Sequence, residues 1–264
     1  MAFFTGTIFS KSLLQDTSFA VILPQDGRRY IWSEPPKTLV LLHGLSDSAM
    51  TWIRRTAIER YAERYNLAVI IPEVHRSWYQ DMVYGDKAFR YITEEVLDVA
   101  SSMFHISTKR KDVLIAGLSM GGYGALRIAL EASDKFAYCG AFSGAYDLED
   151  IYRMATEPGG ESVLEGLAED YAAIFGETRK VPDDVKIENI IMKVKGRKNL
   201  PKVYMMCGTD DFLYGHTNAV RPLCEKYLPD FIYEEWPGHH EWDMWDEAIE
   251  RMLKHFLGPG RKDF

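Results

Sequence analysis

The stretch LIAGLSMGGYGAL, from Leu114 to Leu126, runs from an apolar segment into a helical pattern through a turn rich in glycine. Its glycines are Gly117, Gly121, Gly122 and Gly124, and Ser119 lies between the first two. Glycine is costly inside a helix or a strand, so such a cluster needs a structural reason.

The sequence GLSMG follows a buried strand and precedes a helix, which is the context of a nucleophile elbow, G-x-S-x-G. In such a turn the serine has a strained backbone, and residues two positions away must lack a Cβ. The alternative is a phosphate-binding turn, but the lysine or later acid of those fingerprints is missing. The pattern therefore predicts that Ser119 is a nucleophile.

The fold follows from the segments on either side of this turn. Almost continuously apolar runs occur at 38–43, 67–71, 113–117 and 202–208 and are typical of parallel strands buried on both faces. Helical periodicity covers 89–103 and 242–256, so we expect an α/β fold with a mostly parallel sheet and helices on both faces. Further strands are expected at 137–142 and 231–236, and an antiparallel edge at 3–10 and 17–23.

Length and composition predict one domain over residues 1–264. Residues 146–200 are expected to form a small cap insertion, because this segment has many charged residues and the loop-forming sequences EPGGES and KVPDDVK. A net charge of −8 argues against nucleic acid as a partner. No run reaches 18 apolar residues, which predicts no membrane span. Three cysteines among apolar residues and an N-terminus without signal-peptide features predict a cytoplasmic protein.

A serine nucleophile needs a histidine as general base and a carboxylate that orients it. In this architecture they should follow the serine in the order acid, then histidine, at the ends of later strands. TDDFLY offers Asp210 or Asp211, and PGHHEW offers His239 or His240. Spacing alone leaves both choices open.

Attack on an ester carbonyl also needs donors for the oxyanion. The N–H of Met120, just after the nucleophile, and the N–H of Leu45, in the loop after the first central strand, are the expected donors. His43 is then expected to hold that loop. Trp78 and Tyr79 could line the cleft as substrate-binding residues, with ordinary core packing as the alternative.

The adjacent histidines do not form the i, i+4 pair of a zinc-protease helix, so we expect no metal site. With the motifs read in order, the chain resembles the esterase D family of α/β-hydrolases, especially its tributyrin esterase branch, from about residue 15 to 257. The resemblance is carried by LLHGLSD, SWYQDMVYG, GLSMGGYGALRIAL, FSGAYDL, CGTDDFLY and GHHEWDMWDEAI.

This resemblance implies an α/β-hydrolase fold and a catalytic Ser119. The family's acid lies three residues after a glycine in G-x-x-D-F-L, which corresponds to Asp211 after Gly208, and its histidine precedes x-W, which corresponds to His240. It further implies a serine carboxylesterase for short-chain acyl esters, without cofactor, acting on a small-molecule ester. Relatives are often oligomeric, which suggests a homo-oligomer.

Members of this family also cleave S-formylglutathione, carbohydrate acetyl groups and feruloyl esters, so these are the alternative substrates. DDFLY lacks the extra residue that the glutathione-thioester branch has before Phe-Leu, and the segment from Ser77 to Tyr79 differs as well. The resemblance therefore places the thioesterase second.

Overall fold

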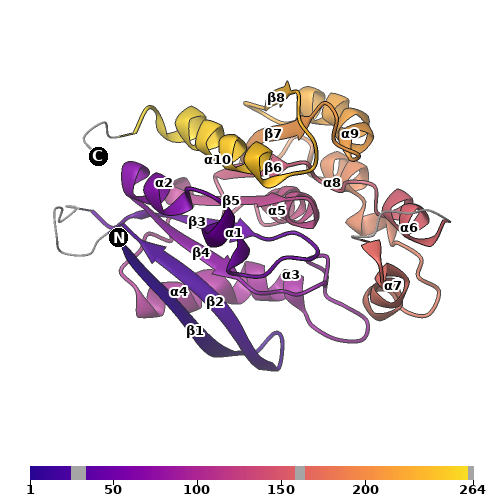
Figure 1. Ribbon diagram of the computed structural model, residues 1–264, viewed down its shortest axis with the longest axis horizontal. Helices are drawn as coiled ribbons and strands as arrows, with labels where there is room; N and C mark the ends of the chain where they lie inside the picture. Colours follow the sequence, from indigo (N-terminus) through magenta and orange to yellow (C-terminus); the bar gives the residue numbers. More distant parts are fainter. Residues whose placement is uncertain (25–33, 158–163, 261–264) are drawn as a thin grey trace.

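An eight-stranded sheet in the order β1-β2-β4-β3-β5-β6-β7-β8 forms the centre of the computed structural model, which describes residues 1–24, 34–157 and 164–260 (Figure 1). The strands are β1 (Ala2–Ser10), β2 (Gln15–Leu23), β3 (Lys37–Leu42), β4 (Leu67–Pro72), β5 (Val113–Leu118), β6 (Tyr138–Phe142), β7 (Lys202–Gly208) and β8 (Ile232–Trp236).

Strands β4, β3, β5, β6, β7 and β8 run parallel, whereas β1 and β2 form an antiparallel hairpin that joins the sheet at β4. The expected mostly parallel sheet and its antiparallel edge are therefore confirmed, with strand ends within a few residues of the predicted ones. Strands β4 and β5 are buried along their whole length, because helices cover both faces.

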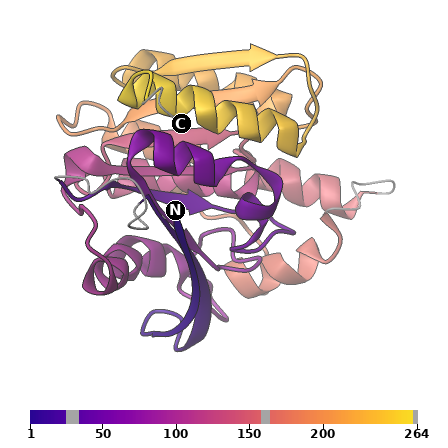
Figure 2. The ribbon, with the colours of Figure 1, turned by 60° about the vertical axis from the view of Figure 1, so that its left-hand side comes forward.

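One face of the sheet is covered by α1 (Thr51–Arg55), α2 (Ile58–Tyr65) and α10 (Trp242–Leu257), and α10 lies beside α2 in both views (Figures 1 and 2). The other face is covered by α4 (Val96–Met103), α5 (Met120–Glu131), α8 (Ile187–Val194) and α9 (Tyr214–Tyr227).

The helix predicted over 89–103 is present as α3 (Ala88–Arg90), a π-helical turn (Tyr91–Glu95) and α4. No helix in the described ranges is long and apolar enough to cross a membrane. Cys139, Cys207 and Cys224 are buried and unpaired, as expected of small core residues.

The segment between β6 and β7 divides into two parts. Helices α6 (Leu148–Thr156) and α7 (Leu167–Phe175) pack on each other beyond the end of the sheet (Figure 1), where a cap was expected. Helix α8 instead packs on α5 and α9 and belongs to the helix layer. The predicted cap over 146–200 therefore includes a helix of the main body, and residues 158–163 lie outside the described residues.

The glycines of the opening stretch allow α5 to approach the strands at backbone contact distance. A Cβ on Gly117 would lie 2.4 Å from the carbonyl oxygen of Gly121. A Cβ on Gly121 would lie 2.6 Å from the carbonyl oxygen of Leu42 and 2.7 Å from that of His43. Both distances are shorter than any normal contact, so the glycines are required for the close approach of strand β3, strand β5 and helix α5.

Because Gly117 has no room for a methyl group, Gly117→Ala should destabilise the protein by about 2 kcal/mol or more, lowering Tm by roughly 5 °C. Gly215, near the start of α9, has nothing within 4 Å of its Cβ position apart from the adjoining backbone of its own helix, so Gly215→Ala should leave Tm unchanged or raise it slightly. Thermal unfolding of the two variants side by side tests this. Equal Tm values would contradict the proposed close approach.

Candidate active site

The predicted site residues come together where the parallel strands end. Ser119 follows β5, Asp211 follows β7 and His240 follows β8, while the loop 43–47 follows β3. Because the carboxyl ends of parallel strands meet at one edge of a sheet, residues far apart in the sequence can form one site there.

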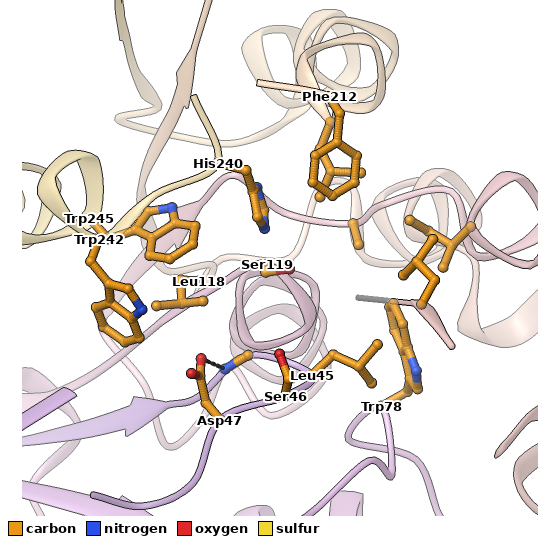
Figure 3. A pocket seen from close by; sticks show the side chains of 15 residues that line it. Leu45, Ser46, Asp47, Trp78, Leu118, Ser119, Phe212, His240, Trp242 and Trp245 are labelled. Carbon is orange, nitrogen blue, oxygen red and sulfur yellow. Dashed lines mark hydrogen bonds between the residues drawn. The ribbon is translucent and has the colours of Figure 1, made fainter. Parts of the chain in front are cut away.

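Ser119 has the strained backbone expected of the elbow, with φ 54° and ψ −119°. Its N–H donates to the carbonyl of Phe142 (2.9 Å), and its own carbonyl accepts from the N–H groups of Gly122, Tyr123 and Ala145. Such a conformation costs about 1–3 kcal/mol, and these bonds hold it in place. The half-buried side chain lies at the cavity floor (Figure 3).

Asp211 and His240 form a close pair. The Nδ1 of His240 lies 2.9 Å from Oδ2 and 3.0 Å from Oδ1 of Asp211, whose carboxylate is fully buried and also accepts the N–H of Leu213. The imidazole packs between the rings of Phe212 and Trp245, with centroids 4.6 and 4.8 Å away. These contacts fix the ring so that its free edge faces Ser119 (Figure 3).

The neighbouring residues Asp210 and His239 point elsewhere and are exposed. The carboxylate of Asp210 accepts the N–H of Gly238 (3.3 Å), and the Nδ1 of His239 lies 3.2 Å from the carbonyl oxygen of Asp210. These two residues join the turn after β7 to the turn after β8. The structure therefore pairs Asp211 with His240, the combination that the family resemblance favoured.

The loop after β3 carries the expected oxyanion donor Leu45 beside the start of α5. Met120 is the first residue of α5, so its N–H has no acceptor within the helix. Among the described residues, the N–H of Leu45 has no hydrogen-bond acceptor either. Both N–H groups are thus available to a bound molecule.

A cavity of about 200 Å³ opens above Ser119. Its apolar walls come from the strand-end loops, from α10 and from the segment between β6 and β7. The described residues that line it are Gly44, Leu45, Ser46, Asp47, Trp78, Leu118, Ser119, Ala145, Ile151, Leu164, Phe212, Leu213, His240, Trp242 and Trp245.

Of the two aromatic residues expected in the cleft wall, Trp78 lines the cavity and Tyr79 does not. Tyr79 is fully buried, and its hydroxyl donates to the carbonyl of His43 (2.8 Å). Its ring also lies against Gly124, where a Cβ would be 2.5 Å from it. The expected position of Tyr79 in the cleft is therefore corrected, because its ring fills the space between α5 and the loop after β3.

Two acidic residues that the sequence patterns did not single out also belong to this region. Asp47 lines the cavity, and its Oδ2 accepts the N–H of Gly44 (3.1 Å); burial raises the pKa of its carboxyl. Glu73, the first residue after β4, has its Oε1 3.1 Å from the Nε2 of the fully buried His43. The signal for both was their position just after buried strands, within LLHGLSD and LAVIIPE.

Glu73 is ionised despite its burial. Burial alone would raise the pKa of Glu73, but hydrogen bonds from His43 and from the N–H groups of Ala49 and His75 outweigh it and lower the pKa to about 2. The side chain is 10% exposed. Among the described residues, no group of three or more His, Cys, Asp and Glu side chains is arranged to hold a metal ion.

Comparison with known proteins relates most of the chain to esterases. Residues 10–256 match a protein family described as "Putative esterase". An acetyl esterase of Caldicellulosiruptor saccharolyticus is 34% identical over 262 residues, covering 96% of this chain and 97% of the relative.

Two solved structures from Staphylococcus aureus are each 34% identical and cover 97% of this chain and 98% of theirs. One is the substrate-bound fluorophosphonate-binding serine hydrolase F, with a TM-score of 0.83. The other is an S-formylglutathione hydrolase without ligand, with a TM-score of 0.81.

The lowered pKa of Glu73 predicts how its contribution to stability depends on pH. Because the folded pKa lies below the ordinary value of 4.5, the contribution is fully present above about pH 5 and is lost as pH falls through 2. The shift corresponds to about 3 kcal/mol.

Urea unfolding of wild type and Glu73→Gln at pH 7, 5, 4 and 3 measures this contribution. The stability difference should shrink by about 2 kcal/mol between pH 5 and pH 3. The exposed Glu188→Gln is the matched control and should show no such trend. A difference that stays constant with pH would contradict the hydrogen bonds assigned to the Glu73 carboxylate.

Proposed function

The chain belongs to this esterase family and is a carboxylic ester hydrolase of the α/β-hydrolase fold; from this premise we propose that it is a serine carboxylesterase for short-chain acyl esters, of the tributyrin esterase branch of the esterase D family. The observation that carries the proposal is the Asp211–His240 pair facing Ser119 on its strained turn.

In the proposed mechanism, the Nε2 of His240 takes the proton of the Ser119 hydroxyl as its oxygen attacks the ester carbonyl. Asp211, hydrogen-bonded to Nδ1, orients the ring and stabilises the imidazolium that forms. The N–H groups of Leu45 and Met120 stabilise the oxyanion. His240 then protonates the leaving alcohol and activates the water that hydrolyses the acyl-enzyme.

The size of the cavity supports a short acyl group. Ile151 on α6, Leu164 before α7 and Trp78 line its apolar side. A long acyl chain would have to displace these packed side chains, whereas an acetyl or butyryl group would not. The acetyl esterase relative is consistent with this size limit.

A second candidate is hydrolysis of S-formylglutathione by the same residues, favoured by the 34% identical relative of that name. Carbohydrate acetyl esters and feruloyl esters are further alternatives for the same reaction. Asp47 and His240 are the ionisable residues among the described lining residues, and no Lys or Arg lines the cavity there. Glutathione carries two carboxylates, so the charge of the lining favours neutral esters.

We also infer that the enzyme acts in the cytoplasm. The support is that its three cysteines are buried and unpaired, which suits a reducing compartment.

Substitutions of the proposed catalytic residues, compared with substitutions of the adjacent acid and histidine, test the proposed mechanism. Ser119→Ala, Asp211→Asn and His240→Gln should each lower kcat/KM for p-nitrophenyl butyrate by at least about 10³-fold. The adjacent variants Asp210→Asn and His239→Gln should stay within about 3-fold of wild type, because these side chains point away from the site. Similar losses in both sets would contradict the assignment.

Among p-nitrophenyl acetate, butyrate, octanoate and laurate, the two short esters should have the highest kcat/KM in initial-rate measurements. Ile151→Ala and Leu164→Ala should each raise the ratio of octanoate to acetate turnover, since they remove part of the cavity wall. If laurate is the best substrate of the wild type, the short-chain proposal is wrong.

The carboxylate of Asp47 should disfavour leaving groups that carry negative charge. We expect kcat/KM for 4-acetoxybenzamide to exceed that for 4-acetoxybenzoate, and Asp47→Asn to reduce this ratio by about five-fold. This variant removes the charge and retains an oxygen for the N–H of Gly44. A wild-type preference for S-formylglutathione over these neutral esters would favour the second candidate.

A further inference from the structure

Gly44, the residue before the expected oxyanion donor Leu45, is held at both of its backbone polar groups. Its N–H donates to Oδ2 of Asp47 (3.1 Å). Its carbonyl accepts from Nδ1 of His43 (2.8 Å) and from the N–H of Asp47 (3.3 Å). Since a carbonyl oxygen can only accept, Nδ1 of His43 must carry a proton.

Because the peptide unit is rigid, the contact of the Gly44 carbonyl also determines the direction of the Leu45 N–H. The Gly44–Leu45 peptide is trans and planar, so its C=O and N–H point to opposite sides. The carbonyl faces the buried ring of His43, and therefore the N–H of Leu45 faces the other way. Leu45 lines the cavity that contains Ser119, and the loop 44–47 runs beside the start of α5 (Figure 3).

His43 itself cannot rotate freely. Its side chain is fully buried, and Nε2 lies 3.1 Å from Oε1 of Glu73 and 3.3 Å from the backbone nitrogen of Val74. Glu73 is fixed in turn, because Oε2 accepts the N–H of Ala49 (2.9 Å) and Oε1 that of His75 (2.9 Å). The carbonyl of His43 accepts the hydroxyl of Tyr79 (2.8 Å). Ring and backbone are both anchored, so the ring presents Nδ1–H to Gly44 in one orientation.

A role for His43 in proton transfer does not fit these contacts. Both ring nitrogens are engaged, the side chain has no exposed surface, and the free edge of His240 already faces Ser119. A second buried histidine–carboxylate pair thus lies behind the oxyanion loop, whereas the Asp211–His240 pair borders the cavity.

We propose that His43, oriented by Glu73, and Asp47 are positioning residues of the oxyanion hole: they clamp Gly44 so that the Leu45 N–H points at the carbonyl oxygen of an ester on Ser119. This inference rests on the proposed function, because it assigns the clamp to the same reaction. Its energetic effect is bounded by the loss of one oxyanion donor, which costs about 10²–10³-fold in kcat.

Two isosteric substitutions separate the two contacts of the ring. In His43→Asn the side-chain amide can replace Nδ1–H and still donate to Gly44, whereas in His43→Gln it can replace Nε2 and contact Glu73 instead. Asn is one methylene group smaller than Gln, so His43→Asn leaves the larger void at this buried place, and lost packing alone would make it the worse variant of the two. We expect His43→Gln to lower kcat for p-nitrophenyl acetate about 10²-fold, with KM within about 3-fold of wild type. The kcat of His43→Asn should be at least about ten-fold higher than that of His43→Gln.

A spectroscopic measurement reports on the oxyanion directly. In the addition of Ser119 Oγ to a trifluoromethyl ketone, the serine proton passes to His240 and the ketone oxygen becomes an oxyanion. The pKa of this hemiketal, followed by 19F NMR, should rise by about two units in His43→Gln and by less in His43→Asn. A residue that only stabilised the fold would lower Tm and leave this pKa unchanged.

The control is another histidine–glutamate pair away from the site. His255 on α10 has its Nε2 3.0 Å from Oε1 of Glu234, and the side chain is partly exposed. His255→Gln should keep wild-type kcat and hemiketal pKa. All rates are expressed per serine labelled by a fluorophosphonate, so that partly unfolded preparations are compared on active molecules.

The outcomes distinguish a failure of the proposed esterase function from a failure of the proposed clamp on Gly44. If wild type neither turns over esters nor is labelled at Ser119, the proposed function fails. If wild type is active but His43→Gln matches His43→Asn in kcat and hemiketal pKa, the clamp is wrong. If neither His43 variant folds, the Asp47 variants test the clamp. Asp47→Ala removes the acceptor of the Gly44 N–H, so its kcat on the neutral ester should be at least about ten-fold below that of Asp47→Asn. Equal rates would overturn the proposal.

Discussion

The backbone contact between helix α5 and the ends of strands β3 and β5 is the constraint on which the site depends. Without side chains at Gly117 and Gly121, the start of α5 reaches the carbonyls of Leu42 and His43. This places the turn of Ser119 beside the loop after β3, where Leu45 lies. A larger residue at either glycine would separate Ser119 from the loop after β3, because the atoms in contact belong to the backbone and cannot move aside.

Two histidine–carboxylate pairs lie around this contact and differ in what surrounds them. The Asp211–His240 pair borders the cavity, and the imidazole packs between two aromatic rings, one tilted and one edge-on, with one edge free. The Glu73–His43 pair is buried, and both ring nitrogens are occupied. The same residue types therefore leave a ring edge open to the cavity in one place and none in the other, because burial decides which partners a ring nitrogen can reach.

The cavity wall depends on how α6 and α7 are attached to the main body. The Nε2 of His216 on α9 lies 3.0 Å from Oδ2 of Asp150, which precedes Ile151 on α6. Arg76, after β4, donates to Asp170 on α7 (2.8 Å) and to the carbonyl of Glu165. These ties hold Ile151 and Leu164 against the cavity. The segment between β6 and β7 thereby shapes the cavity on the side of Ile151 and Leu164, while Ser119, Asp211 and His240 follow the ends of strands.

The sequence alone determined the parallel sheet, the antiparallel edge, the elbow at Ser119 and the order of acid and histidine. These follow from local patterns, namely apolar runs, glycine spacing and strand-end position. It left Asp210 and Asp211, and likewise His239 and His240, undecided by spacing, because adjacent residues in a turn point to different sides and only packing fixes which side faces the site.

Tertiary structure also decided what local patterns do not encode. Tyr79 follows Trp78 directly, yet its hydroxyl reaches His43 in the core while Trp78 lines the cavity. Glu73, Asp47, Ile151 and Leu164 become parts of the site through contacts between segments distant in the chain, and α8 belongs to the helix layer for the same reason. Which side chains share a pocket is set by the approach of whole elements, and that depends on packing across the entire sheet.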